Sequence, residues 1–93
     1  MYVPQIKSLD TALRIYYSYP ELGNKEIQEL FTKCSPATVS RLKQEAKMEM
    51  RKRAVLSYSA NAVNTDVAYS TWGLDPKDLE RRRKKMKELN IEV

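Results

Sequence analysis

The sequence of 93 residues contains no histidine, one cysteine and only two glycines. Without histidine, a histidine general base, a Ser-His-Asp triad and histidine metal ligation are excluded. The single thiol, Cys34, cannot form an internal disulfide or a cysteine-rich zinc site. Two glycines do not build a glycine-rich phosphate loop, and the acidic residues form no set at catalytic or metal-ligand spacing. We therefore expect a protein that is not an enzyme and holds no metal or other cofactor.

Long apolar runs are also missing, and the longest apolar stretches are too short to span a membrane. The first ten residues, MYVPQIKSLD, have neither the basic region nor the apolar region of a signal peptide. A lone cysteine fits a reducing compartment. We expect a cytoplasmic protein with no membrane partner, and no small-molecule substrate is evident.

The positive charge is concentrated in one part of the chain. Residues 35–54 carry six basic and two acidic side chains, whereas residues 1–34 carry four of each. Residues 75–93 carry seven basic and five acidic side chains. A localised basic stripe favours a polyanionic partner more than a uniform excess of charge would.

Two short helices are predicted before residue 34. The first begins after Ser8, whose hydroxyl can cap a helix N-terminus, and ends before Pro20. The second covers residues 25–33 and is capped by Asn24. Apolar residues recur three and four positions apart in both segments, as in amphipathic helices.

The third predicted helix, residues 36–53, carries the clearest signals. Ser35 is a strong N-cap residue, and Pro36 occupies the first helical position, which tolerates proline best. Residues at helical spacing form an inner apolar stripe: Val39, Leu42, Ala46 and Met50. The side chains expected to face outward are Arg41, Lys43, Gln44 and Lys47.

The remainder of the chain predicts a loop and two further helices. Residues 57–64 are small and polar and are expected to form the loop. Thr65 is expected to cap a short helix that ends before Gly73, and Asp75-Pro76 opens a longer one. Trp72, with Tyr69, is expected to fasten these helices to the domain; the alternative is an exposed anchor for another protein.

The segment Lys25 to Lys43, KEIQELFTKCSPATVSRLK, has the layout of a short helix, a turn and a second helix. It resembles the helix-turn-helix of lactose-repressor-type regulators and of resolvase and phage DNA-binding proteins, which commonly read EIAELFGVSxxTVSRLL. The best match is SPATVSRL, residues 35–42. Three features depart from this pattern: Gln28 replaces a small residue, Thr32-Lys33 stands in place of the turn glycine, and the turn is one residue longer.

This resemblance implies an all-α fold with a small three-helix helix-turn-helix domain, followed by one short and one longer C-terminal helix. We expect residues 1–56 to form the DNA-binding core. Residues 57–93 are expected to form a helical extension that packs on the core or mediates dimerisation.

The resemblance also implies sequence-specific binding of double-stranded DNA, as a small transcriptional regulator or as a DNA-binding factor of a phage or mobile element. Arg41 would reach O6 and N7 of a guanine, and Thr38 and Ser40 would donate to phosphates. Pro36 and Ala37 could offer only apolar contact, for instance to a thymine methyl. The candidate DNA-binding residues are Ser35, Pro36, Ala37, Thr38, Ser40, Arg41, Gln44 and Lys47.

Several alternatives stay open. One such motif reads only a few base pairs, so a homodimer or a partner protein is expected. The alternative function is a non-enzymatic adaptor in a recombination, packaging or replication complex, which Gln28 and the longer turn favour.

The run Arg81 to Lys85 is interpreted as a solvated basic helix, with a second DNA-backbone contact as the alternative. Cys34 is expected to be a packed thiol, and Tyr16, Tyr17 and Tyr19 to be core and rim residues rather than base-stacking ones.

Overall fold

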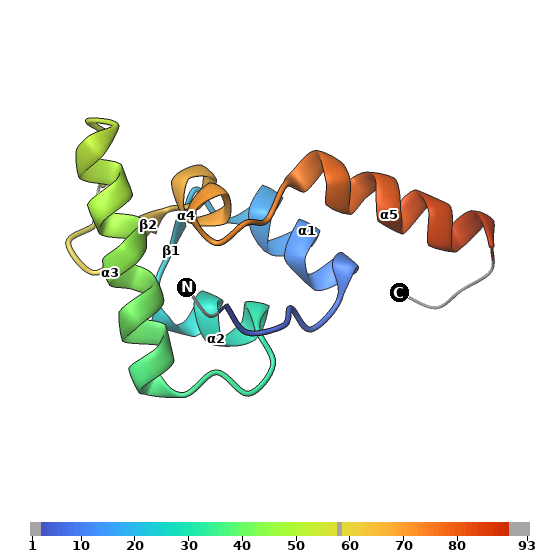
Figure 1. Cartoon of the computed structure of the whole chain (residues 1–93), viewed down its shortest axis with the longest axis horizontal. Coiled ribbons are helices and arrows are strands. Elements are labelled where there is room, and N and C mark those ends of the chain that lie inside the picture. The colour runs from blue at the N-terminus through green and yellow to red at the C-terminus, as the bar shows by residue number, and fades with distance from the viewer. Residues whose placement is uncertain (1–2, 58, 90–93) are drawn as a thin grey trace.

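The computed structural model describes residues 3–57 and 59–89, which form a mostly helical small domain, as the sequence predicts. Within these residues the elements in chain order are α1 (Leu9–Ser18), β1 (Glu21–Leu22), α2 (Asn24–Leu30), α3 (Pro36–Lys52), β2 (Val63–Asn64), α4 (Thr65–Thr71) and α5 (Pro76–Glu88). Helix α3 lies at one end of the molecule and α5 at the other, with α1, α2 and α4 between them (Figure 1). The longest extent is 41 Å. No helix in the described ranges is both long and apolar enough to cross a membrane.

Three of the predicted helix N-termini are confirmed by the hydrogen bonds of their caps. The hydroxyl of Ser8 accepts the N–H of Thr11, and that of Ser35 accepts the N–H of Thr38. Asp75 caps α5 in the same way through its carboxylate. Side chains that satisfy these otherwise unpaired N–H groups fix where each helix begins.

The predicted start of α2 is wrong by one residue. Asn24 is the first helical residue and Gly23 is the N-cap. The carboxylate of Glu26 accepts the N–H of Gly23 at 2.9 Å, so the cap is stabilised from within the first turn. The amide of Asn24 instead accepts a hydrogen bond from Lys43 of α3.

The predicted end of α2, at residue 33, is also wrong. The helix ends at Leu30 because the N-terminal segment pairs with the chain that follows. Lys7 N–H donates to the carbonyl of Leu30 at 3.0 Å, and Thr32 N–H donates to the carbonyl of Gln5 at 2.8 Å. These two bonds flank Phe31, whose backbone is extended, so the helix cannot continue through it.

The predicted loop 57–64 is partly wrong, because its last two residues form β2. This strand pairs antiparallel with β1, with Leu22 opposite Val63. The following helix is capped by Asn64 rather than by Thr65, since the Asn64 side chain accepts the N–H of Val67 at 3.0 Å. Thr65 is buried instead, and its hydroxyl donates to the carbonyl of Tyr19 at 2.6 Å.

All five described helices contribute to one hydrophobic core. Tyr69 of α4 and Trp72, the C-cap residue of that helix, are buried within it, as expected. The Tyr69 hydroxyl donates to the carbonyl of Ala12 at 2.6 Å, and the indole N–H of Trp72 donates to the carbonyl of Leu42 at 3.1 Å. Helix α4 is therefore fastened to both α1 and α3 by buried polar contacts.

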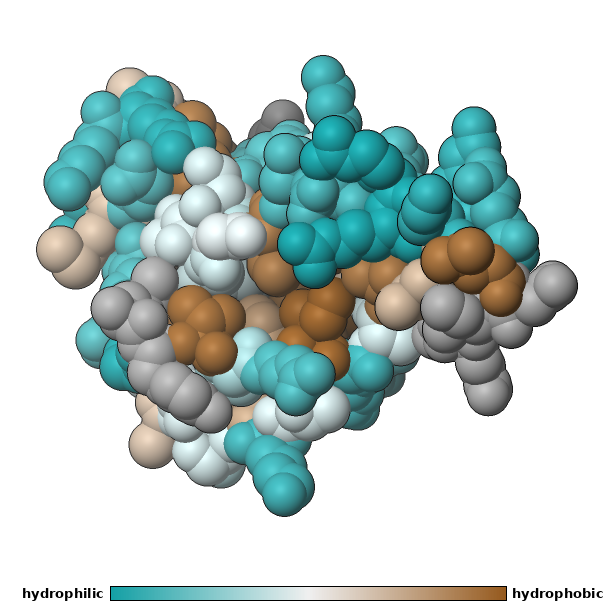
Figure 2. Space-filling model, turned by 45° about the vertical axis from the view of Figure 1, so that its right-hand side comes forward, coloured by the Kyte–Doolittle hydropathy of each residue, from teal (hydrophilic) through white to brown (hydrophobic). Residues whose placement is uncertain are grey.

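Helix α5 packs along α1 and buries only Leu79. Tyr17 of α1, an exposed rim residue, donates to the carboxylate of Glu80, and Arg83 pairs with Asp10. Figure 2 brings the α5 side of the molecule forward. Hydrophilic side chains cover much of its upper surface, and apolar side chains show in the centre.

Candidate nucleic-acid interface

Helix α3 has one fully buried side and one side that no other element covers. Its predicted inner stripe is confirmed, because Val39, Leu42, Ala46 and Met50 are all buried. Helical geometry of about 100° per residue places Ala37, Gln44 and Met48 in the centre of the opposite side. All three are exposed, and Met48 retains 56% of its surface. We call Ala37, Gln44 and Met48 the outward row.

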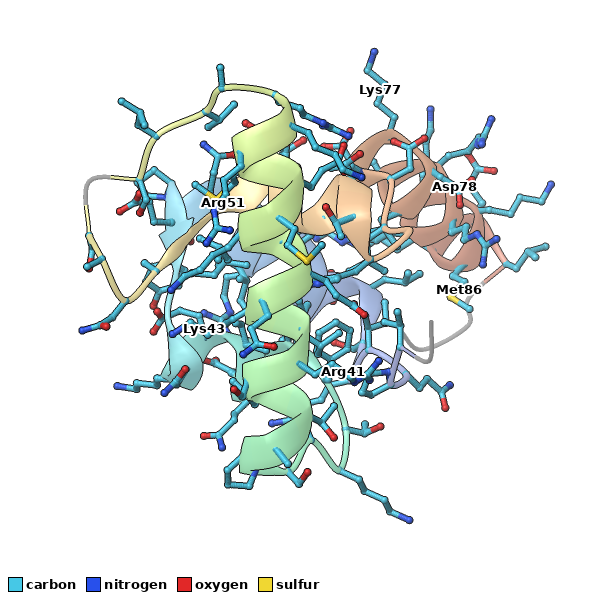
Figure 3. All side chains as sticks on the ribbon, turned by 60° about the vertical axis from the view of Figure 1, so that its left-hand side comes forward. Arg41, Lys43, Arg51, Lys77, Asp78 and Met86 are labelled. Atoms are coloured by element: carbon cyan, nitrogen blue, oxygen red, sulfur yellow. The ribbon has the colours of Figure 1, made fainter. Side chains whose placement is uncertain are left out.

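Basic residues flank the outward row on both sides. Figure 3 faces α3 and shows Arg41 on one side of the helix, with Lys43 and Arg51 on the other. The exposed residues of α3 are Pro36, Ala37, Ser40, Gln44, Met48, Arg51 and Lys52. None of them is acidic, so the uncovered side of α3 is neutral in the middle and basic towards its C-terminal end.

The start of α3 presents a capped helix N-terminus to solvent. Ser35 and Pro36 are exposed, and the first turn contains no acidic residue. The hydroxyls of Ser35 and Thr38 lie 3.0 Å apart and share a hydrogen bond. A helix N-terminus carries partial positive charge, which is favourable towards an anion such as a phosphate.

Arg41 is half-buried beside the outward row. Its Nη1 atom lies 3.9 Å from Oε1 of Glu45, one helical turn further on. It also lies near the Cys34 thiol, where its charge opposes the effect of burial, which raises the pKa of Cys34. The guanidinium is therefore held at the side of α3.

Lys43 and Lys47, which are expected to face outward, hold the loop before β2 instead. The Lys43 ammonium donates to the amide oxygen of Asn24 at 3.0 Å and to the carbonyl of Asn61 at 2.6 Å. Lys47 donates to the carbonyl of Ala60 at 3.1 Å. Burial, and then the nearby Lys47 charge, lower the pKa of Lys43. The structure therefore gathers the other seven candidate residues at the exposed side or the start of α3, while Lys47 is turned towards the loop.

The turn between α2 and α3 keeps a glycine-like conformation without a glycine. Lys33 has a φ of 48°, in the left-handed region that glycine adopts most easily. The next residue, Cys34, is half-buried against the core, as expected for a packed thiol. A residue in the left-handed conformation is thus present in this turn, and it is a lysine.

Comparison with protein-family models, with curated proteins and with solved structures finds no match for this chain. The helix-turn-helix interpretation therefore rests on the resemblance carried by the segment Lys25 to Lys43. Among the described residues, no group of three or more cysteine, aspartate and glutamate side chains is placed to hold a metal ion.

The basic run Arg81 to Lys85 does not form one surface. Arg83 turns inward to Asp10, whereas Arg81 and Arg82 both pair with Asp78. The Arg81 hydrogen bond is the main reason that the pKa of Asp78 lies below its usual value. Lys84 and Lys85 stay exposed on the outer side of α5, at the opposite end of the molecule from α3 (Figure 1).

Met48 and Arg51 belong to the exposed side of α3, although they are not among the candidate residues. Their positions could have been found in the sequence, because Met48 follows Gln44 by four residues and Arg51 follows it by seven. Residues at these spacings share one face of a helix. Helical spacing alone therefore places Met48 and Arg51 on this face, although neither residue belongs to the helix-turn-helix sequence pattern.

Proposed function

We propose that this protein binds double-stranded DNA sequence-specifically and inserts the exposed side of α3 into the major groove. It would act as a small regulator or as a phage or mobile-element DNA-binding factor, not as an enzyme, and without a cofactor. The observation that carries the proposal is the exposed side of α3. A 17-residue helix buries one side completely, while every exposed residue of its other side is neutral or basic.

The elements around α3 support this use. Helix α2 packs against both α1 and α3. Arg14 of α1 also forms an ion pair with Glu29 of α2, so α1 and α2 together support the buried side of α3. Lys33, in the turn just before α3, is exposed. Contacts of such a lysine to phosphates position a recognition helix without reading sequence.

A salt titration tests binding. We expect measurable affinity for random duplex DNA at low salt, with log K falling linearly against log salt concentration because phosphate contacts release counterions.

The variants Ser40→Glu and Ser18→Glu distinguish a contact of α3 with DNA from a general effect of the protein's net charge. Both serines are exposed helical residues, and both changes add one negative charge. Ser40→Glu should weaken binding by about tenfold or more, since one lost charged contact costs about 1–3 kcal/mol, and Ser18→Glu should not. Equal affinities of the two variants would contradict the proposal that the exposed side of α3 binds DNA.

Useful specificity requires more contacts than one helix provides, because a single motif reads only a few base pairs. The proposal therefore includes a homodimer or a protein partner on the DNA. Analytical ultracentrifugation with and without a selected duplex measures the number of copies bound.

A second candidate is an adaptor that uses the same side of α3 to contact a protein. Met48 favours it, because an apolar side chain that is 56% exposed at the centre of a helix face suits a protein contact. The same titration separates the two: an adaptor should show no salt-dependent affinity for duplex DNA at any salt concentration.

A further inference from the structure

The side chains of the outward row, one amide and two apolar groups, indicate which base pairs they could contact in the major groove. We infer that α3 reads A·T base pairs in the major groove, with Gln44 on an adenine and with Ala37 and Met48 on thymine methyl groups. This inference rests on the proposed function and names the class of target site.

The three side chains of the outward row match the major-groove edge of A·T pairs. Adenine presents an acceptor, N7, beside a donor, N6, and a glutamine amide offers one donor and one acceptor in reply. Thymine presents a methyl group, which apolar side chains contact. Gln44 is exposed, and no hydrogen bond joins its amide to another residue in the described ranges. Its amide therefore meets a base without first breaking an internal contact.

The three cations that flank the outward row, Arg41, Lys43 and Lys47, already have partners, whereas Arg51 and Lys52 lie beyond Met48, the last residue of the row. Guanine presents two acceptors, which arginine or lysine recognises. In the first three turns of α3, Arg41 lies beside Glu45, and Lys43 and Lys47 donate to carbonyls of residues 60–61. Each of them would have to exchange an existing interaction for a guanine edge, whereas Gln44 would not.

The spacing of the outward row suits a short run of base pairs. Ala37 and Met48 are eleven residues apart in α3, which corresponds to about 16 Å along a helix at 1.5 Å per residue. Gln44 lies between them. Base pairs rise by about 3.4 Å, so the row spans on the order of five of them.

Selection of bound sites from a random duplex pool gives the first test. We expect the recovered sites to share a short run of A·T pairs. Recovery of a run centred on G·C pairs would overturn the inference and assign Arg41 as the reader, while leaving DNA binding intact. Absence of any binding at low salt would overturn the proposed function and this inference together.

Base analogues test the individual contacts on a selected site. Replacing adenine by 7-deazaadenine removes the N7 acceptor, and replacing thymine by uracil removes the methyl group. We expect the 7-deazaadenine duplex to bind about 5- to 150-fold more weakly at one position, because the loss of N7 leaves an N–H of the Gln44 amide without its acceptor. This loss should vanish in Gln44→Ala, because the two changes remove the same contact.

Gln28→Ala is the matched control for Gln44→Ala. Gln28 is also an exposed helical glutamine, but it lies on α2. It should keep both the affinity and the full 7-deazaadenine effect. If Gln44→Ala keeps the effect as Gln28→Ala does, Gln44 does not read adenine and the inference is wrong.

Discussion

Tyr69 links α4 to α1 through a buried hydrogen bond. It is the largest of the fully buried side chains, and its hydroxyl bonds to the carbonyl of Ala12, 57 positions earlier. Desolvation by burial raises its pKa well above the usual value. On the neighbouring ring of Tyr16, a hydrogen bond to the Asp66 carboxylate raises the pKa to about 12. Both phenols are therefore held protonated by the folded state.

These raised pKa values predict a loss of stability in alkali. The unfolded tyrosines lose their protons near pH 10, while the folded chain retains them, so the unfolded state binds fewer protons above that pH. The free energy of unfolding should be unaffected below about pH 10 and should fall above it. Tyr69→Phe should flatten this decline. At neutral pH it should lower the free energy of unfolding by about 1 kcal/mol, the typical value of one hydrogen bond.

Urea unfolding at a series of pH values from 7 to 11.5 measures this dependence. Tyr19→Phe is a suitable control, since Tyr19 lies at the surface of the same region. A Tyr69→Phe variant with the same alkaline decline as the unmodified chain would show that this phenol does not control it.

At single residues, the sequence predicts which face a side chain occupies better than what it contacts. Ser35 and the buried stripe of α3 follow from local spacing and are confirmed. The partners of Lys43 and Lys47 are carbonyls 18 and 13 positions away, respectively, in a loop without periodicity. Contacts of that kind depend on tertiary packing, so the inward turn of these lysines could not be predicted.

Helices α3 and α4 end in the same hydrogen-bonded turn but with different residues. After α3, Ala54 N–H donates to Arg51 and Val55 N–H donates to Met50. After α4, Gly73 and Leu74 make the equivalent bonds to Ser70 and Tyr69. This pattern is a Schellman motif, whose central residue is left-handed. Ala54 has a φ of 56° and Gly73 has a φ of 77°.

The two helix ends give opposite predictions. Ala54→Gly should raise the free energy of unfolding by up to about 1 kcal/mol, because glycine removes the strain of a left-handed alanine. Part of this gain is offset by the greater freedom of glycine in the unfolded chain. Gly73→Ala should lower it by roughly 1 kcal/mol. A Cβ at Gly73 would meet no atom within 4 Å, so the loss comes from the backbone conformation alone.

Thermal and urea unfolding of both single variants and of the double variant measures these effects. Arg53, beside Ala54, donates to the hydroxyl of Ser70, whose carbonyl accepts the N–H of Gly73, so the double variant measures whether the two effects add. Changes of opposite sign in the free energy of unfolding at the two positions would support a left-handed, strained Ala54. A destabilising Ala54→Gly would indicate that alanine is not strained there.

For whole elements, capping residues predict where helices begin. Pairing between segments that are far apart in the chain could not be predicted from the sequence. Ser8, Ser35 and Asp75 act over three residues or fewer, within reach of local pattern. The early end of α2 depends on residues 5–7, and β2 depends on β1, about forty positions earlier. Strands of two residues show no alternation, so no periodicity could have revealed them.

At the scale of the molecule, the helices after residue 62 complete the core on which α3 rests. Val63, Val67, Ala68, Tyr69 and Trp72 are all buried with residues of α1, α2 and α3. The rings of Phe31 and Trp72 meet at 5.6 Å between centroids. The proposed DNA-binding surface therefore requires α4 behind it, whereas α5 adds only Leu79 to the core.

Two truncations should consequently behave differently. A chain of residues 1–56 loses every buried contact of β2, α4 and α5, and we expect it to lack a cooperative unfolding transition because too little apolar surface remains covered. A chain of residues 1–74 keeps all of these contacts except that of Leu79 and should fold with reduced stability. Far-ultraviolet circular dichroism during thermal unfolding distinguishes them, and only the longer chain should retain salt-dependent binding to duplex DNA. A cooperative transition in the 1–56 chain would mean that α1, α2 and α3 form a complete core without the indole and phenol of α4.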